Sequence, residues 1–164
     1  EEIRRISNLS FPTMKKYLNF LEKTYISLFV KPYFKNKRTE IVKNPKTYFF
    51  DNGLRNFAVE DFRKIQDRTD GGALLENAVA MQLIKQGLNF NFWRNKQKSE
   101  IDFVVFAPDN KKIALEIKTN FKKSDSQTKS ASHFQSEHPE IALRFCSFEF
   151  APEIKNQALF IPMI

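Results

Sequence analysis

Two short runs of alternating charged and apolar residues carry the side chains of this chain that could do hydrolytic chemistry. The first run, residues 100–105, reads Glu-Ile-Asp-Phe-Val-Val, and the second, residues 113–118, reads Ile-Ala-Leu-Glu-Ile-Lys. Pro108, Asp109 and Asn110 lie between the runs and are typical turn residues. The pattern therefore predicts two strands joined as a hairpin.

Side chains two positions apart on a strand lie on the same face. Glu100 and Asp102 are therefore expected to share one face of the first strand, and Glu116 and Lys118 one face of the second. A patch of three carboxylates and one ammonium could hold a divalent metal ion and activate a water molecule beside a phosphodiester. Alternation is also typical of any half-buried strand, so a purely structural interpretation stays open. The apolar residues expected on the opposite faces are Ile101, Phe103, Leu115 and Ile117.

The composition indicates one ordinary domain, with or without a small appendage. The chain has 164 residues, of which 41% are hydrophobic and 28% charged, enough apolar side chains to form a core. A lone cysteine, Cys146, excludes a disulfide within the chain and fits a reducing cytoplasm. Neither a membrane span nor a signal peptide is recognised, so we expect a cytoplasmic protein without membrane contact. The first residue is Glu1 instead of Met, which we interpret as part of a longer protein.

Positive charge is concentrated in the first third of the chain. Residues 1–48 contain 11 Lys and Arg against 4 Asp and Glu, whereas residues 49–164 contain 16 against 15. Such asymmetry favours a segment that binds a polyanion, although a basic surface also aids solubility. The residues that we expect to contact DNA are Lys15, Lys16, Lys35, Lys37 and Arg38.

The predicted elements of this basic segment follow the order of a small winged-helix unit. Ser10 and Pro12 form a helix-start signal, a capping hydroxyl followed by proline in the first turn. Extended runs over residues 25–33 and around residues 48–50 flank basic residues, as two strands flank a wing. We assign residues 1–55 to a winged-helix-like segment. An ordinary α/β subdomain with solvated charges would give the same pattern.

Residues 56–164 are expected to form a second unit, of the α/β class. Gly87 ends the strongest predicted helix, residues 73–86, in which Glu76 borders the apolar face. The order of helix, three strands, helix and strand predicts a mixed central sheet. Strands are predicted over residues 90–94, 100–106, 112–119, 143–146 and 158–161, and further helices over residues 54–62 and 130–137.

The placement of four charged residues resembles the PD-(D/E)XK nuclease superfamily. Glu76 lies on the helix before the sheet, Asp102 on the second strand, and Glu116 and Lys118 form a Glu-x-Lys motif on the third. The order of elements is also similar to the restriction-endonuclease-like core of that superfamily. The chain departs from the superfamily pattern at Ile101, where the pattern has proline.

Nearly all of residues 8–150 resembles the C-terminal part of bacterial and archaeal AAA-type ATPases whose conserved tail is a domain of unknown function. Those proteins start with a P-loop ATPase module and end in a winged-helix segment and a nuclease-like domain. The chain has no Gly-x-x-x-x-Gly-Lys-Ser/Thr loop, so we expect no ATP site in it. The segments that carry the resemblance are residues 10–13, 42–46, 48–54, 74–77, 92–94, 100–104 and 116–118.

The resemblance implies a metal-dependent DNA nuclease. Asp102 and Glu116 would hold Mg²⁺ or Mn²⁺, and Glu76 would reach the same ion directly or through water. Lys118 would orient or deprotonate the attacking water, or stabilise charge on the phosphate. Glu100 could be a further ligand, but we favour an exposed acid without a catalytic role.

The implied partners are DNA and the ATPase module, and the nuclease-like fold often works as a homodimer. The alternative function is a nuclease-like module that has lost activity and regulates the ATPase by binding DNA or protein. His133 and His138 are five positions apart and are expected on the surface rather than at a metal. Trp93 and most phenylalanines are expected in the core.

Overall fold

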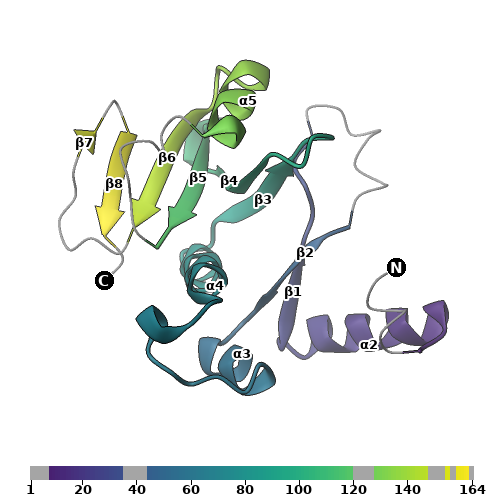
Figure 1. Ribbon diagram of the computed structural model, residues 1–164. Helices are drawn as coiled ribbons and strands as arrows, with labels where there is room; N and C mark the ends of the chain where they lie inside the picture. Colours follow the sequence, from purple (N-terminus) through teal and green to yellow (C-terminus); the bar gives the residue numbers. More distant parts are fainter. Residues whose placement is uncertain (1–7, 35–43, 120–127, 148–153, 156–157, 163–164) are drawn as a thin grey trace.

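A mixed β-sheet with helices on both faces forms the larger part of the molecule, and a β-hairpin and its helix are attached beside it (Figure 1). The computed structural model describes residues 8–34, 44–119, 128–147, 154–155 and 158–162. The strand order is β3-β4-β5-β6-β8-β7. These strands are β3 (Asn89–Arg94), β4 (Glu100–Phe106), β5 (Lys112–Lys118), β6 (Ala142–Ser147), β7 (Ile154–Lys155) and β8 (Ala158–Pro162).

The direction of the strands changes across this sheet. β4 runs antiparallel to β3 and β5, whereas β6 runs parallel to β5 and β8. The turn between β4 and β5 contains a short 3₁₀ helix, Pro108–Asn110. The predicted hairpin and the predicted mixed α/β sheet are therefore confirmed, and the restriction-endonuclease-like core stays a prediction. The two-residue strand β7 was not predicted from the sequence.

Two helices cover opposite faces of the sheet, α4 (Gly71–Lys85) and α5 (Lys129–Glu137). Val79 and Leu83 of α4 pack with Phe103 in one apolar cluster. Phe134 of α5 packs with Trp93 in a second cluster, so the core position expected for Trp93 is confirmed. α4 ends near the predicted position, where Gly87 follows with a φ of 71° that only glycine adopts without strain.

A β-bulge in β4 changes which residues share a face. Asn91 of β3 pairs with Val104 and Trp93 pairs with Ile101, so β4 uses one more residue than β3 over this stretch. Ile101 consequently packs in the α5 cluster and Phe103 in the α4 cluster. The expectation that Ile101 and Phe103 lie together on one face was wrong, because simple alternation does not continue through a bulge.

The described part of the basic segment contains a helix and two antiparallel strands. Ser10 caps the first helix, where its hydroxyl accepts a hydrogen bond from the Thr13 N–H, as the sequence predicts. The winged-helix assignment stays a prediction, and the predicted wing-tip residues lie outside the described part of the chain. The elements are α2 (Phe11–Lys23), β1 (Ser27–Val30) and β2 (Lys46–Phe49), followed by α3 (Asn52–Ala58).

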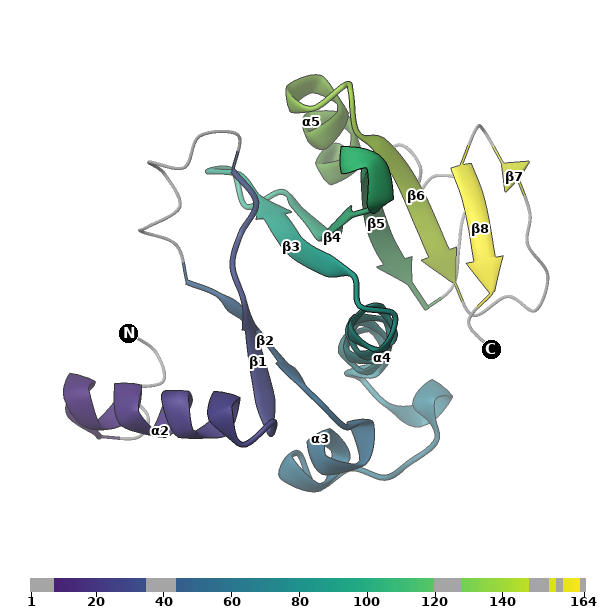
Figure 2. The same ribbon diagram turned by 180° about the vertical axis from the view of Figure 1, so that it is seen from behind.

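The hairpin lies against α4 and β3, whereas α2 extends away from it (Figure 2). Val30 and Tyr48 are buried in the α4 cluster, which joins the hairpin to the core of the sheet.

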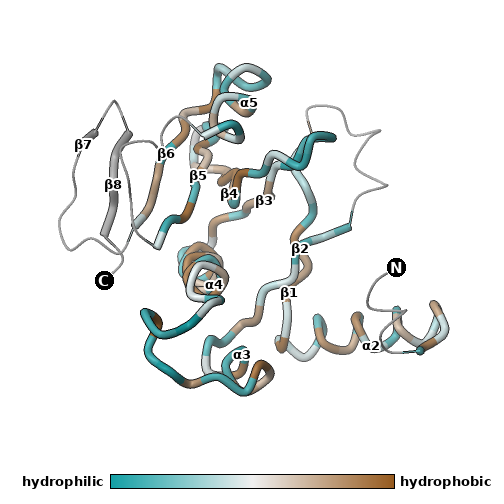
Figure 3. Tube along the Cα trace, in the orientation of Figure 1, coloured by the Kyte–Doolittle hydropathy of each residue, from teal (hydrophilic) through white to brown (hydrophobic). Residues whose placement is uncertain are grey.

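Apolar and polar residues alternate along α2 (Figure 3). Its buried residue is Met14, while Phe11 and Tyr17 are each 58% exposed. No helix in the described ranges is long and apolar enough to cross a bilayer.

The two histidines are less exposed than expected. His138 is 4% exposed, and its ring lies against the rings of Tyr33, Trp93 and Phe134. His133 is half-buried, with its Nδ1 2.7 Å from the Ser99 hydroxyl. The predicted surface position of His138 was wrong because this residue, which caps the C-terminus of α5, packs in the aromatic cluster.

Candidate active site

Four acidic side chains from one helix and two strands form the centre of the candidate site. α4 contributes Glu76, β4 contributes Glu100 and Asp102, and β5 contributes Glu116. Their side chains are only 10–25% exposed. We call these four residues the acidic cluster. Burying four carboxylates is unfavourable unless cations or hydrogen-bond donors compensate the charge.

Lys46 supplies one of these cations. Its Nζ lies 2.7 Å from Glu76 Oε1, 2.5 Å from Glu100 Oε1 and 3.4 Å from Asp102 Oδ1. Burial alone would lower the pKa of Lys46, but the carboxylates outweigh it and raise the pKa above the ordinary value. Lys46 is therefore a cation at neutral pH. Lys46 lies in the segment 42–46 that carries the family resemblance, but the sequence interpretation gave it no role in the site.

Tyr48 lies two positions after Lys46 on β2 and reaches the same cluster. Its hydroxyl donates a hydrogen bond of 2.5 Å to Glu76 Oε1. Burial and the charge of Glu76 raise the pKa of Tyr48, so it stays a protonated donor. The ring stacks on Phe103 with centroids 5.7 Å apart, which fixes the position of the hydroxyl. The sequence signals for this pair were the period-two spacing of Lys46 and Tyr48 and their place in the segments that carry the family resemblance.

Different groups compensate the negative charges of the Asp102 and Glu116 carboxylates. Asp102 Oδ2 accepts a hydrogen bond of 2.9 Å from the Ile117 N–H. Glu116 Oε1 lies 2.8 Å from Lys118 Nζ, but Glu116 Oε2 is buried without a hydrogen-bond partner. Burial and the charges of Glu116 and Glu76 raise the pKa of Asp102 to about 7. Burial also raises the pKa of Glu116, against the effect of Lys118.

Asp102 and Glu116 are the residues of the acidic cluster that could hold a hard divalent cation. In the ranges that the structure describes, no three His, Cys, Asp or Glu side chains are arranged as a ready metal site. However, the partnerless Glu116 Oε2 and the raised pKa of Asp102 both indicate negative charge that is not fully compensated. Carboxylate oxygens are the ligands that Mg²⁺ and Mn²⁺ prefer. Glu76 as a third ligand stays a prediction, since its Oε1 already accepts from Lys46 and Tyr48.

Glu100 is part of the cluster instead of an exposed acid. Its side chain is 25% exposed and forms ion pairs with Lys46 and Arg94. Burial would raise the pKa of Glu100, but the hydrogen bonds from Arg94 and Lys46 outweigh it and lower the pKa. The expectation of an exposed acid was wrong because Lys46, which is remote in the sequence, reaches this carboxylate.

The structure describes two of the five residues predicted to contact DNA. Lys15 and Lys16 are exposed on α2, which packs against β1. Lys35, Lys37 and Arg38 lie outside the described residues. Their contact with DNA stays a prediction.

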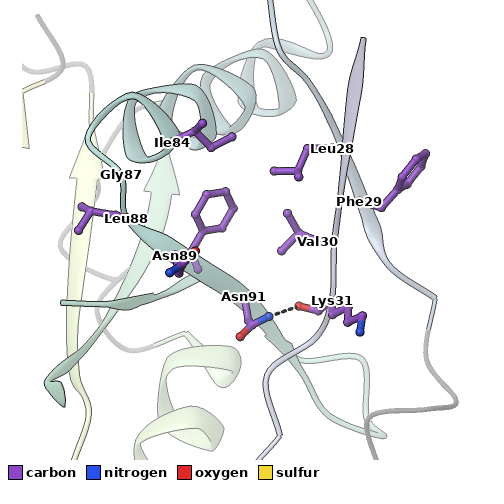
Figure 4. A pocket seen from close by; sticks show the side chains of 10 residues that line it. Leu28, Phe29, Val30, Lys31, Ile84, Gly87, Leu88, Asn89 and Asn91 are labelled. Carbon is purple, nitrogen blue, oxygen red and sulfur yellow. Dashed lines mark hydrogen bonds between the residues drawn. The ribbon is translucent and has the colours of Figure 1, made fainter. Parts of the chain in front are cut away.

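A cavity of about 410 Å³ lies between β1, the end of α4 and β3 (Figure 4). Leu28, Val30 and Ile84 line it, and the Asn91 side chain donates a hydrogen bond of 3.0 Å to the Lys31 carbonyl at its edge. No residue of the acidic cluster lines this cavity. It therefore has no part in the candidate chemistry.

Asn77 holds the strand that carries Lys46 and Tyr48. Its side chain is buried, accepts a hydrogen bond of 2.7 Å from the Phe49 N–H and donates one of 2.9 Å to the Phe49 carbonyl. It also donates to the Asn52 side chain at 2.7 Å. Asn77 thereby joins the end of β2 to α4 in the same helix that carries Glu76.

Replacing Asn77 with alanine is expected to lower the free energy of unfolding by about 2–3 kcal/mol, because it leaves the N–H and carbonyl of the half-buried Phe49 without their Asn77 partners. Urea unfolding followed by circular dichroism measures this change. Gln82→Ala, an exposed position on the same helix, is the matched control and should change stability little. Equal stability of the two variants would contradict this role for Asn77.

Comparisons with known proteins match both parts of the chain. Residues 71–163 match a family described as "Domain of unknown function (DUF4143)", and residues 1–66 match one described as "Domain of unknown function (DUF8612)". An uncharacterized protein of Haemophilus influenzae (strain ATCC 51907 / DSM 11121 / KW20 / Rd) is 28% identical over 117 residues. That alignment covers 70% of this chain and 28% of the relative, so the chain spans a minor part of the relative's length. No solved structure matches the chain.

The two matched segments meet in the candidate site. The acidic cluster lies within residues 71–163, whereas Lys46 and Tyr48 lie within residues 1–66. The ion pairs and the hydrogen bond from β2 therefore join side chains of both segments in one site.

Proposed function

The chain belongs to the family described as "Domain of unknown function (DUF4143)", a domain found at the C-terminus of AAA-ATPase-like proteins, and we propose that it is a metal-dependent DNA nuclease forming such a C-terminal part. The proposed reaction is hydrolysis of a DNA phosphodiester. The observation that carries the proposal is the acidic cluster itself, with the partnerless Glu116 Oε2 and the Lys118 ammonium beside the same carboxylate.

The proposed roles follow from the contacts of each side chain. Asp102 and Glu116 would hold Mg²⁺ or Mn²⁺, which when bound would polarise a phosphoryl oxygen and acidify a water molecule. The Ile117 N–H orients the Asp102 carboxylate. Lys118 is 28% exposed, so its ammonium can approach a phosphate while it contacts Glu116. There it would orient the water or stabilise charge on the phosphate.

Nicking of supercoiled plasmid DNA tests the proposal. The protein is expected to nick the plasmid with Mn²⁺ or Mg²⁺ and to leave it intact with EDTA. Glu116→Gln should reduce nicking to the level seen with EDTA, since it removes a charged ligand. Glu137→Gln, the same change at an exposed position on α5, should keep full activity. Nicking that persists in Glu116→Gln would contradict the proposed site.

A binding module without catalytic activity is the second candidate. It is favoured by the exposed aromatic side chains on α2, where Phe11, Tyr17 and Phe20 are each 58% exposed beside Lys15 and Lys16. Aromatic and basic side chains together suit contact with a partner. DNA binding that is equal with metal and with EDTA, and no nicking under either condition, would favour this candidate over the nuclease.

A further inference from the structure

Positively charged residues of the chain compensate most of the negative charge of the acidic cluster. Four carboxylates face two ammonium groups, those of Lys46 and Lys118, which leaves an excess of two negative charges. Arg94, at the edge of the site with 41% exposure, pairs with Glu100 and reduces the excess to one. One divalent cation is enough to compensate this charge. Two would leave a half-buried site with three excess positive charges, which is unfavourable.

The carboxylate oxygens of the acidic cluster border two separate positions, one at Lys46 Nζ and one at Glu116 Oε2. Lys46 Nζ contacts one oxygen each of Glu76, Glu100 and Asp102. On the other side, Glu116 Oε2 is buried and has no hydrogen-bond partner. Asp102 lies next to both positions, because its Oδ1 is 3.4 Å from Lys46 Nζ and its Oδ2 accepts a hydrogen bond of 2.9 Å from the N–H of Ile117, the residue after Glu116. A carboxylate between two cations is the arrangement of a two-metal site.

We propose that the site takes one divalent cation and that the Lys46 ammonium occupies the position of a second. This inference rests on the proposed nuclease function. Lys46 is then a positioning residue that holds Glu76, Glu100 and Asp102 in place, and Tyr48 supports it by its hydrogen bond to Glu76. The Lys46 side chain is 15% exposed, and its ammonium contacts three of the four carboxylates of the acidic cluster.

The number of Mn²⁺ ions bound per chain tests the proposal without an assay of cleavage. Electron paramagnetic resonance of free Mn²⁺, with calorimetric titration, is expected to give one ion for the unmodified protein. Lys46→Gln removes the internal cation and is expected to bind two. Lys46→Arg keeps the charge and should bind one, as should Lys85→Gln, the same neutralisation at an exposed position at the end of α4.

Two ions bound by the unmodified protein would overturn the proposal, and that result needs no variant. One ion bound by Lys46→Gln would overturn it as well, and Lys46→Met replaces this variant if Lys46→Gln does not fold. If the proposed nuclease function itself is wrong, the Mn²⁺ binding measurements give a different result. In that case no Mn²⁺ binds, or Glu116→Gln leaves the binding of the first ion unchanged.

Discussion

Lys118→Met is expected to reduce DNA cleavage by about 10²–10⁴-fold while the affinity for DNA stays within about twofold. Methionine has a similar length but neither the charge nor the protons of the ammonium. The Lys118 Nζ lies 2.8 Å from Glu116 Oε1 and is one of the few charged groups of the site that also reaches solvent. Its removal should therefore affect the reacting phosphate more than the position of the bound DNA.

Single-turnover cleavage of a labelled duplex, measured beside the dissociation constant for the same duplex, separates these effects. Lys112→Met is the matched control, since Lys112 lies on the same strand but places its ammonium over the Tyr33 ring. Full activity of Lys118→Met would contradict a catalytic role for Lys118 and leave it only the ion pair with Glu116.

Lys118→Arg adds information on the role of the ammonium. Arginine keeps a positive charge but does not give up a proton at ordinary pH. Partial recovery of cleavage in Lys118→Arg would indicate stabilisation of charge on the phosphate. No recovery would indicate that Lys118 exchanges a proton with the attacking water.

Local patterns predicted the elements that carry the four motif residues. Alternation over residues 100–106 and 112–119 predicted β4 and β5 nearly to the residue, because each strand has polar residues that border apolar ones. The apolar spacing of residues 73–86 likewise predicted α4, with Glu76 at the border of its apolar face. Such signals depend on neighbours within a few positions, and these elements are regular over most of their length.

The other half of the site could not be predicted in the same way. Lys46 is separated from Glu76 by 30 positions and from Asp102 by 56, and their contact depends on how the hairpin packs on α4. That packing depends on Asn77, which joins β2 to the helix by side-chain hydrogen bonds that no periodicity reveals. The sequence did not predict the bulge in β4 either. A strand with one extra residue has the same kinds of residues as a regular strand, so its composition does not reveal the bulge.

The concentration of negative charge predicts that the candidate site is destabilising when no metal is bound. Asp102→Asn is expected to raise the free energy of unfolding of the metal-free protein at pH 8 by about 2–4 kcal/mol, at about 1.4 kcal/mol per pKa unit. Burial and the neighbouring carboxylates raise the pKa of Asp102 from 3.8 to about 7. An asparagine oxygen can still accept the hydrogen bond from the Ile117 N–H, so the substitution removes the charge and keeps this contact.

The gain in the free energy of unfolding from Asp102→Asn is expected to depend on pH. A carboxyl whose pKa is higher in the folded state binds its proton more tightly there, so its contribution to stability is complete below about pH 4 and is lost as the pH rises through 7. The advantage of Asp102→Asn over the unmodified protein should therefore be small at pH 4 and full at pH 8. Urea unfolding at both pH values with EDTA measures it, and Asp67→Asn, at an exposed position, is the control.

Saturating Mn²⁺ should reverse the order of stability, because an ion held by Asp102 and Glu116 stabilises the folded state of the unmodified protein and binds the variant less tightly. A group that lowers stability in the absence of its ligand and raises it in the presence of that ligand is typical of a functional site. If the unmodified protein is at least as stable as Asp102→Asn at pH 8 with EDTA, Lys46 compensates the Asp102 charge completely. The acidic cluster is then a closed ion-pair network with no negative charge left for a metal.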